Sequence, residues 1–227
     1  MKILIATLFA FALTSTGVFA QDEGAATSAE RPYDVAVNFT ADTLQQPWVK
    51  EFRYVVVVNK AVKGSEKQSV KVFEYGQLIT TDKVSTGRDA FEKKGEHHSK
   101  HDSWSVTPTG FYSPDYLDID HKSSSYGGRF SWLVGGVKMP FAIFFNGGIA
   151  LHQAPKGTEG QLGTNASGGC IRLPGALASD LFARVNETNG AKIPKFTVDG
   201  QPKLDKDGHQ LYRNGFSALI IVQSQVR

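Results

Sequence analysis

The sequence predicts a mainly β fold with one principal helix packed on it. Apolar β-branched runs recur along the chain, turn-forming residues separate them at short intervals, and only one stretch has helical apolar spacing. Hydrophobic residues make up 41% of the chain and charged residues 21%, as in folded soluble domains. The 227 residues fit one domain with an additional tail.

The first predicted strand is the run RYVVVVNKA at residues 53–61, whose continuous apolar character suits a buried position. Residues 69–87 follow as two strands on either side of a turn at Glu74–Gln77. Gly76 supplies the backbone freedom that a tight turn needs. These segments therefore predict three consecutive strands.

Three segments without a strand pattern come next. Residues 88–106 are rich in Lys, Glu and His and are interpreted as a charged loop. At residues 107–110, TPTG, the proline fixes φ and the glycine lets the chain bend, which indicates a rigid turn. Residues 113–138 are rich in serine, glycine and aromatic residues, and long segments of this kind are often lids or binding loops.

The last part of the chain returns to regular patterns. A hairpin is predicted with strands at Phe141–Phe145 and Ile149–His152. The principal helix is predicted at Leu177–Asn186, because a proline precedes it, helical apolar spacing runs through it, and an Asn-Gly pair follows it. The run GFSALIIVQ at residues 215–223 predicts a final buried strand.

The N-terminus has the layout of a secretory signal peptide at residues 1–20. A positive start precedes an apolar run, and small residues stand at Val18 and Ala20, before a polar stretch. The alternative is an uncleaved membrane anchor, but the apolar run is short for a membrane span. We expect an exported protein, periplasmic in a cell with an outer membrane, that is not an integral membrane protein after cleavage. Residues 21–50 are interpreted as a linker or irregular lead-in, and residues 51–227 as the folded domain.

The charge pattern favours no nucleic-acid partner. The formal net charge is +3, and no run of Lys and Arg forms a basic footprint. A mixed, solvated surface accounts for this charge.

Cys170 is the only cysteine and lies in ASGGCIRL, residues 166–173. A single thiol cannot form an internal disulfide, so it is buried and inert, paired with another chain, or reactive. Oxidising compartments make an unused exposed thiol a liability. Export therefore favours a functional role for Cys170.

A reactive thiol needs a base, and His152 at the end of an apolar strand is the nearest in sequence. Taken alone, such a histidine more often has a structural role. His97, His98 and His101 have a spacing that could ligate a metal, but they lie in a Lys- and Glu-rich loop with no matching cysteine. We expect no metal site and no cofactor.

The two glycines before Cys170 allow a sharp turn. Such a turn would leave the N–H groups of Gly169 and Cys170 free to face a developing oxyanion. The alternative is an ordinary surface turn beside a small apolar cysteine. Ser167 either forms this turn or orients the loop of an active enzyme.

Arg172 follows Cys170 at a spacing of two. In an extended segment the two side chains share a face while Ile171 points into the core. Arg172 could then bind a substrate carboxylate with both arms of its guanidinium, or form a structural ion pair.

Three segments in order carry a resemblance: TPTG, then MPFAIFFNGGIALH, then LGTNASGGCIRL. They resemble the L,D-transpeptidase catalytic domain (the YkuD family), in which a strand-ending histidine precedes a Ser/Thr-His-Gly-Cys motif followed by an apolar residue and Arg or Asn. His152 lies 18 positions before Cys170, within the family's spacing. The similarity runs from about residue 53 to residue 222.

This resemblance implies a β-sandwich of mixed sheets with one principal helix after the cysteine, and residues 51–227 would be the catalytic domain. It implies that Cys170 is the nucleophile and His152 the base. Gly169 and Cys170 would supply oxyanion-hole N–H groups with help from Gly168, and Arg172 would bind the substrate carboxylate.

The resemblance also implies the substrate. Cys170 would attack the carbonyl of the third residue of a peptidoglycan stem peptide, usually meso-diaminopimelate, and expel D-alanine. The thioester would pass to an amine of a second stem peptide or of an envelope protein. Besides Arg172, the expected substrate-binding residues are Ser167, Gly168, Tyr126 and Trp132, the aromatic ones in a lid that also contains Phe130.

Three departures from the family pattern stand out. Gly168 replaces the family's histidine, Gln153 replaces the glycine that often follows the strand histidine, and residues 191–215 are longer than the usual link. The departures leave the nucleophile and the base in place but leave the acceptor open. Water as acceptor would make the chain a carboxypeptidase or an amidase, and a non-catalytic wall-binding module is the remaining alternative.

Overall fold

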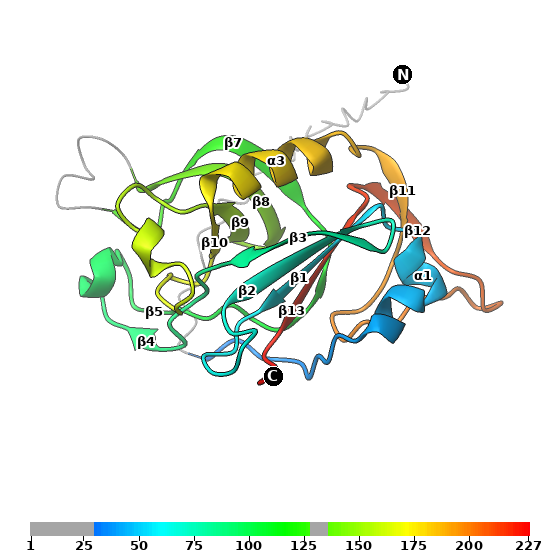
Figure 1. Cartoon of the computed structure of the whole chain (residues 1–227), viewed down its shortest axis with the longest axis horizontal. Coiled ribbons are helices and arrows are strands. Elements are labelled where there is room, and N and C mark those ends of the chain that lie inside the picture. The colour runs from blue at the N-terminus through cyan, green and yellow to red at the C-terminus, as the bar shows by residue number, and fades with distance from the viewer. Residues whose placement is uncertain (1–29, 128–135) are drawn as a thin grey trace, which may run out of the picture.

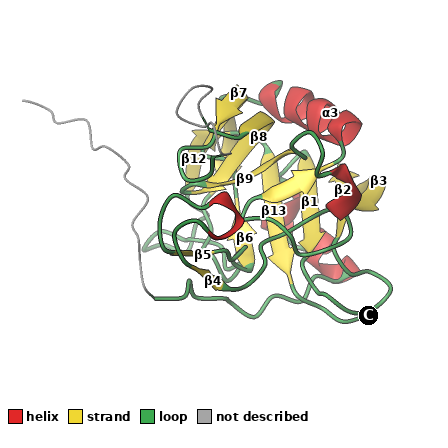
Figure 2. Ribbon diagram, turned by 90° about the vertical axis from the view of Figure 1, so that its left-hand side faces the viewer, coloured by secondary structure: helices red, strands yellow, loops and turns green. Residues whose placement is uncertain are grey.

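The computed structural model describes residues 30–127 and 136–227 (Figure 1). The expected signal peptide, Phe130 and Trp132 lie outside the described residues. Two sheets pack face to face, and α3 (Gly175–Asn186) lies across one end of them (Figure 2). The predicted mainly β fold with mixed sheets and one principal helix is confirmed.

The first sheet has five strands in the order β3-β2-β1-β13-β6. β1 pairs in parallel with β13, and the other pairs are antiparallel. Because β1 and β13 lie in the middle, every residue of both strands is buried, as their apolar runs predict. The strands are β1 (Tyr54–Asn59), β2 (Ser69–Glu74), β3 (Gln77–Lys83), β6 (Gly110–Tyr112) and β13 (Ala218–Gln223).

The second sheet has four strands in the order β10-β9-β8-β7. β10 runs parallel to β9, whereas β7, β8 and β9 form an antiparallel meander. The prediction of a loop at residues 113–138 is wrong in part, because this segment contains the strand β7, which pairs with β8. The strands are β7 (Tyr116–Lys122), β8 (Lys138–Asn146), β9 (Ile149–Gln153) and β10 (Ile171–Leu173).

Several short elements lie outside the two sheets. The charged loop contains the pair β4–β5 and a single 3₁₀ turn, and the long link after α3 contains the antiparallel pair β11–β12. The bounds are β4 (Phe91–Glu92), β5 (Ser103–Trp104), β11 (Ala191–Pro194), β12 (Tyr212–Gly215), α1 (Pro47–Lys50) and 3₁₀ turns at Ala41–Gln45, Glu96–His98 and Glu159–Gln161.

The main core fills the space between the sheets and is closed by α3. The helix contributes Leu177, Ala178, Leu181 and Val185, whose spacing places them on one face. They pack with strand residues of both sheets. The helix begins two residues before its predicted start, because Pro174 occupies the N-cap position.

A second apolar cluster covers the outer face of the first sheet. Trp48 of α1 and Val37 of the lead-in are buried in it. The Trp48 ring stacks on Phe196, with 5.1 Å between ring centroids. The described part of the segment expected to be a linker or irregular lead-in thus contains a 3₁₀ turn and α1, and it packs on the sheet. Among the described helices, none is long and apolar enough to cross a membrane.

Asp34 ties this lead-in to the TPTG turn. Its carboxylate accepts from the Thr109 amide at 2.8 Å and from Lys60 Nζ at 3.0 Å. Arg31 donates to its second oxygen at 2.9 Å. Burial raises the pKa of Asp34. The hydrogen bonds from Thr109 and Lys60 lower it by more than burial raises it, so the pKa lies below its ordinary value.

We expect Asp34→Asn to lower the free energy of unfolding at pH 7 by about 1–3 kcal/mol, because hydrogen bonds to the charged carboxylate are lost. The lowered pKa means that wild-type Asp34 stabilises the fold above its unfolded pKa of about 3.9 and loses this effect as the pH falls below it. Urea unfolding at pH 7 and pH 3 measures the difference, which should shrink at pH 3. Asp120→Asn, at an exposed position, should change stability little at either pH. Equal losses for the two variants at pH 7 would contradict the role of Asp34.

Candidate active site

The parallel pairing of β9 with β10 places the expected site residues on one face. Ile171 lies opposite Leu151, and Arg172 lies opposite His152. Ile171 and Leu151 are fully buried in the core between the sheets. Since side chains alternate along a strand, His152, Cys170 and Arg172 share the other face, as the sequence predicts for the last two.

Cys170 rests on an apolar floor. Its side chain packs against a cluster of four buried residues: Met139, Ala142, Phe144 and Ala150. The Phe144 ring lies between Tyr116, stacked at 4.4 Å between centroids, and His121, edge-on at 4.8 Å. This floor can accommodate the aliphatic part of a substrate beside the sulfur.

The Cys170 thiol is free and half-buried. Its Sγ lies 3.5 Å from the Gly148 carbonyl oxygen, which accepts its proton. Burial raises the pKa of the thiol above its usual value, although the Ala150 amide and the Arg172 charge oppose this shift. Cys170 therefore rests as a neutral thiol.

His152 is buried, and its ring orientation is fixed by the backbone. Nδ1 lies 2.7 Å from the Gln153 carbonyl oxygen. A carbonyl only accepts, so Nδ1 carries the proton and Nε2 is left as an acceptor. Gln153 thus provides this carbonyl despite its departure from the family pattern.

His152 is neutral across the physiological range. Burial lowers its pKa to about 4; the Gln153 carbonyl opposes this shift, and the nearby Arg172 and His121 add to it. His121 of β7 lies 3.0 Å from the Asp118 carboxylate through Nδ1. The sequence analysis missed His121, because only the pairing of β7 with β8 brings it to this face.

Ser167 holds the turn before the nucleophile. Its buried hydroxyl donates to the Cys170 carbonyl at 2.5 Å and accepts from the Gly169 amide at 3.1 Å. The expectation that the Gly169 N–H is free is therefore wrong for this conformation. Both hydrogen bonds of the Ser167 hydroxyl lie within the loop. They favour a role in orienting the loop over direct contact with substrate.

Residues far away in sequence fix the same loop. Thr107 of the TPTG turn donates to the Gly169 carbonyl at 2.5 Å and accepts from the Gly87 amide at 2.9 Å. Arg88 donates to the Ala166 carbonyl at 2.6 Å. Gly169 itself, at φ 130°, leaves only 3.0 Å between a Cβ and the Val106 carbonyl oxygen, so a larger residue does not fit.

Arg88 is held in turn by a buried ion pair in which its Nε and Nη2 donate to the two carboxylate oxygens of Glu92. Glu92 is only 2% exposed. The sequence analysis missed this pair and the bond from Thr107. The i,i+4 spacing of Arg88 and Glu92 was the available signal, but nothing local indicates that their partner is the cysteine loop.

Arg172 is available for a ligand. Its guanidinium donates to Gln161 Oε1 at 2.6 Å, and within residues 30–127 and 136–227 no carboxylate pairs with it. Burial lowers its pKa, with a contribution from the nearby Arg88. The alternative of a structural ion pair finds no partner in the described part of the chain.

Tyr126 occupies the space beside Gly168. Its hydroxyl donates to the Gly168 carbonyl at 3.2 Å. A Cβ at position 168 would lie 2.2 Å from the Tyr126 ring, which is closer than any real contact. The aromatic ring thus stands where the family's histidine side chain would begin. The expected Trp132 lies outside the described residues.

The histidines of the charged loop belong to no group with metal-ligand spacing among the described residues. His97, His98 and His101 are all exposed. Among the described residues, the one group with metal-ligand spacing consists of Asp205, Asp207 and His209, which are all exposed.

Comparisons with solved structures return several L,D-transpeptidases at low identity. The one from Mycobacterium smegmatis is 17% identical, covers 76% of this chain and 59% of its own, and has a TM-score of 0.45. The one from Xylanimonas cellulosilytica is 19% identical over 76% of this chain and 61% of its own, with a TM-score of 0.46. The one from Stackebrandtia nassauensis is 14% identical over 82% and 64%, with a TM-score of 0.42. This chain thus spans about three fifths of the length of these relatives.

No curated protein matches the chain in sequence. The model of the L,D-transpeptidase catalytic domain, YkuD, matches residues 53–199, well over half of the 227 residues. On this match, the chain belongs to the YkuD family of L,D-transpeptidase catalytic domains.

Proposed function

We propose that this chain is an exported, periplasmic cysteine L,D-transpeptidase that acts on peptidoglycan stem peptides. The observation that carries the proposal is the position of Cys170, His152 and Arg172 on one face of β9 and β10. A thiol, a neutral base and an unpaired guanidinium are the groups that acyl transfer from a carboxylate-bearing peptide needs. The family membership supports the same reaction.

In the first half-reaction Cys170 Sγ bonds to the carbonyl carbon of the third stem residue, meso-diaminopimelate, as the thiol proton passes to His152 Nε2. The tetrahedral intermediate collapses, and the C–N bond to D-alanine breaks. His152 returns the proton to the leaving amine, so a thioester and free D-alanine remain. The fixed Nδ1–H of His152 keeps Nε2 directed at these transfers.

In the second half-reaction an amine of the acceptor attacks the thioester carbonyl. His152 Nε2 takes a proton from this amine and passes it to the departing Cys170 sulfur, which restores the thiol. The acceptor is a second stem peptide or an envelope protein. No cofactor takes part in either step.

The oxyanion is stabilised by backbone N–H groups of the cysteine loop. The Cys170 amide donates directly to the oxyanion, and Gly168 helps by allowing the turn that positions these amides. The Gly169 amide joins once it leaves the Ser167 hydroxyl. Arg172 binds the free carboxylate of the donor, and Tyr126 and Trp132 are the further aromatic residues that we propose to bind the substrate.

Tetrapeptide muropeptides incubated with the protein should give cross-linked dimers and free D-alanine, detected by mass spectrometry. Cys170→Ala should reduce both to background, because no other described residue replaces the thiol. Circular dichroism should show that this variant keeps its fold. Activity retained by Cys170→Ala would refute the nucleophile. Shortened monomers without dimers would instead make water the acceptor and the protein a carboxypeptidase.

The pH profile of kcat/KM should have its acid limb near pH 4, set by the lowered pKa of His152. Below that pH a protonated His152 cannot take the thiol proton, so the rate should fall about tenfold per pH unit. His209→Gln, at an exposed histidine, should leave the profile unchanged. A limb near pH 6.5 would show that His152 is not held neutral by burial.

Tyr126 and Gly168 should behave as a coupled pair. Gly168→Ala should lower the unfolding free energy by about 1–3 kcal/mol and slow the alkylation of Cys170 by iodoacetamide, because the new methyl meets the Tyr126 ring. Adding Tyr126→Ala should restore much of both losses, since the ring is gone. Gly160→Ala, where a Cβ meets nothing within 4 Å, is the matched control. Additive effects in the double variant would contradict the packing of this pair.

A further inference from the structure

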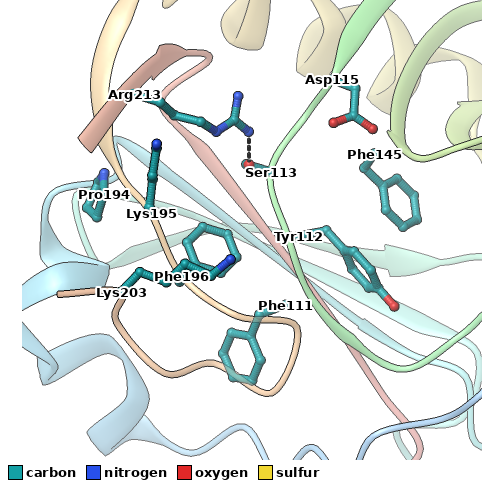
Figure 3. Close-up of a pocket in the computed structure, with 10 residues that line it drawn as sticks. All are labelled: Phe111, Tyr112, Ser113, Asp115, Phe145, Pro194, Lys195, Phe196, Lys203 and Arg213. Atoms are coloured by element: carbon teal, nitrogen blue, oxygen red, sulfur yellow. Dashed lines mark hydrogen bonds between the residues drawn. The ribbon is translucent and has the colours of Figure 1, made fainter. Parts of the chain in front are cut away.

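A pocket of about 370 Å³ lies beside the β11–β12 hairpin, at the edge strand β6 of the first sheet (Figure 3). Its walls come from β6 and the loop after it, from the end of β8, and from residues 194–213. This volume lies within the range of small-ligand sites. None of the site residues named above lines it.

Three cationic side chains line this pocket: Lys195, Lys203 and Arg213. None of them forms an ion pair with any carboxylate of the described residues. One carboxylate, Asp115, lines the opposite side (Figure 3). Three positive charges against one negative charge leave the pocket basic, so it attracts an anion.

The cationic groups project from a backbone that is held firmly. The Lys203 amide donates to the Lys195 carbonyl at 2.9 Å. The side-chain amide of Gln210 donates to the carbonyls of Lys195 and Lys203, at 2.8 Å and 3.2 Å. Arg213 donates to the buried hydroxyl of Ser113 at 2.5 Å (Figure 3). A ligand therefore meets an Arg213 guanidinium already oriented by Ser113 and two exposed lysines that extend from an ordered backbone.

Aromatic rings form the apolar part of the pocket. Phe196 lines it and is itself stacked on Trp48 of the second cluster. Tyr112 lines the far side and contacts Phe145, with 5.2 Å between ring centroids. Such walls cover the aliphatic parts of a ligand whose charged ends reach the three cations.

The pocket is separate from the Cys170 site. It uses Phe145 of β8, whereas the apolar floor under Cys170 uses Phe144, and neighbouring residues of a strand point to opposite faces of the sheet. In Figure 1 the β11–β12 pair lies on the right, whereas β9 and β10, which carry the Cys170 site, lie left of the centre. Lys203 and Arg213 also lie beyond residues 53–199, so the family match does not account for them.

We propose that this pocket is a second binding site, for the carboxylates of an acidic peptide. The planar guanidinium of Arg213 matches a carboxylate, and the two lysines supply point charges for further carboxylate oxygens. That the peptide is a stem peptide of the cell wall rests on the proposed function. A site of this kind would hold the enzyme on its polymeric substrate while Cys170 reacts with a neighbouring peptide.

The test is calorimetric titration of the full chain carrying Cys170→Ala, which removes turnover. The probe is the tripeptide L-Ala-γ-D-Glu-diaminopimelate. Lys195→Gln, Lys203→Gln and Arg213→Gln, combined in this background, should lower the number of bound peptides by one. Lys206→Gln, in the same link but outside the pocket, should leave it unchanged. The loss of one site is expected whether or not the Cys170 cleft also binds, so failure of the proposed function leaves this test intact.

Two further probes examine the ligand class. The same tripeptide with amidated carboxyl groups should not bind to this pocket, so the Cys170→Ala parent and the triple variant should bind equal numbers of amidated peptides. Inorganic phosphate at tenfold excess should not displace the free acid from the pocket. An unchanged number of sites in the triple variant would overturn the proposal. The proposal would also be overturned if the amidated peptide bound to as many sites as the free acid, or if phosphate displaced the free acid from the pocket.

Discussion

The parallel register between β9 and β10 is the constraint on which the site depends. Residues of the two strands lie opposite each other in pairs, so Leu151 and Ile171 point into the core and His152 and Arg172 point to the opposite face. Cys170 directly precedes β10, and its side chain lies on the same face as Arg172. A shift by one residue would bury the thiol face and expose the core face, at a large hydrophobic cost. The packing of α3 against Leu151 and Ile171 therefore stabilises the register that places the site residues, as well as the fold.

The loop before β10 has little regular structure, and polar contacts from distant segments replace it. Thr107, Arg88 and Ser167 each bond to a backbone group of this loop. The buried Glu92 fixes Arg88, which is a costly arrangement unless both charges stay paired. The Ser167 hydroxyl also satisfies the Gly169 amide at rest. The Gly169 amide, which we propose as an oxyanion donor, is thus not left as an unpaired buried N–H in the resting structure.

Electrostatics set the form of the nucleophile. Burial lowers the pKa of His152 and raises that of Cys170, so both groups rest neutral. An ion pair of thiolate and imidazolium is not the ground state in such surroundings. In the proposed reaction the proton therefore moves only as the sulfur attacks. Arg172 and the basic pocket near β11 carry the positive charge that the neutral pair lacks. Attraction of an acidic peptide is in this way separated from activation of the thiol.

Local sequence patterns predict the central strands and the principal helix, and the ordered motif singles out Cys170, His152 and Arg172. These follow from alternation, helical spacing and an ordered motif, all of which are local. The same local patterns miss β7, because its Leu-Asp-Ile-Asp alternation is short and lies in a segment rich in serine and glycine, where only the pairing with β8 identifies a strand. Only the tertiary structure decided that Tyr126 fills the space beside Gly168, that Ser167 occupies the Gly169 amide, and that Lys195, Lys203 and Arg213 surround one pocket. These contacts join segments far apart in the chain, and no local pattern encodes which distant side chain fills a given space.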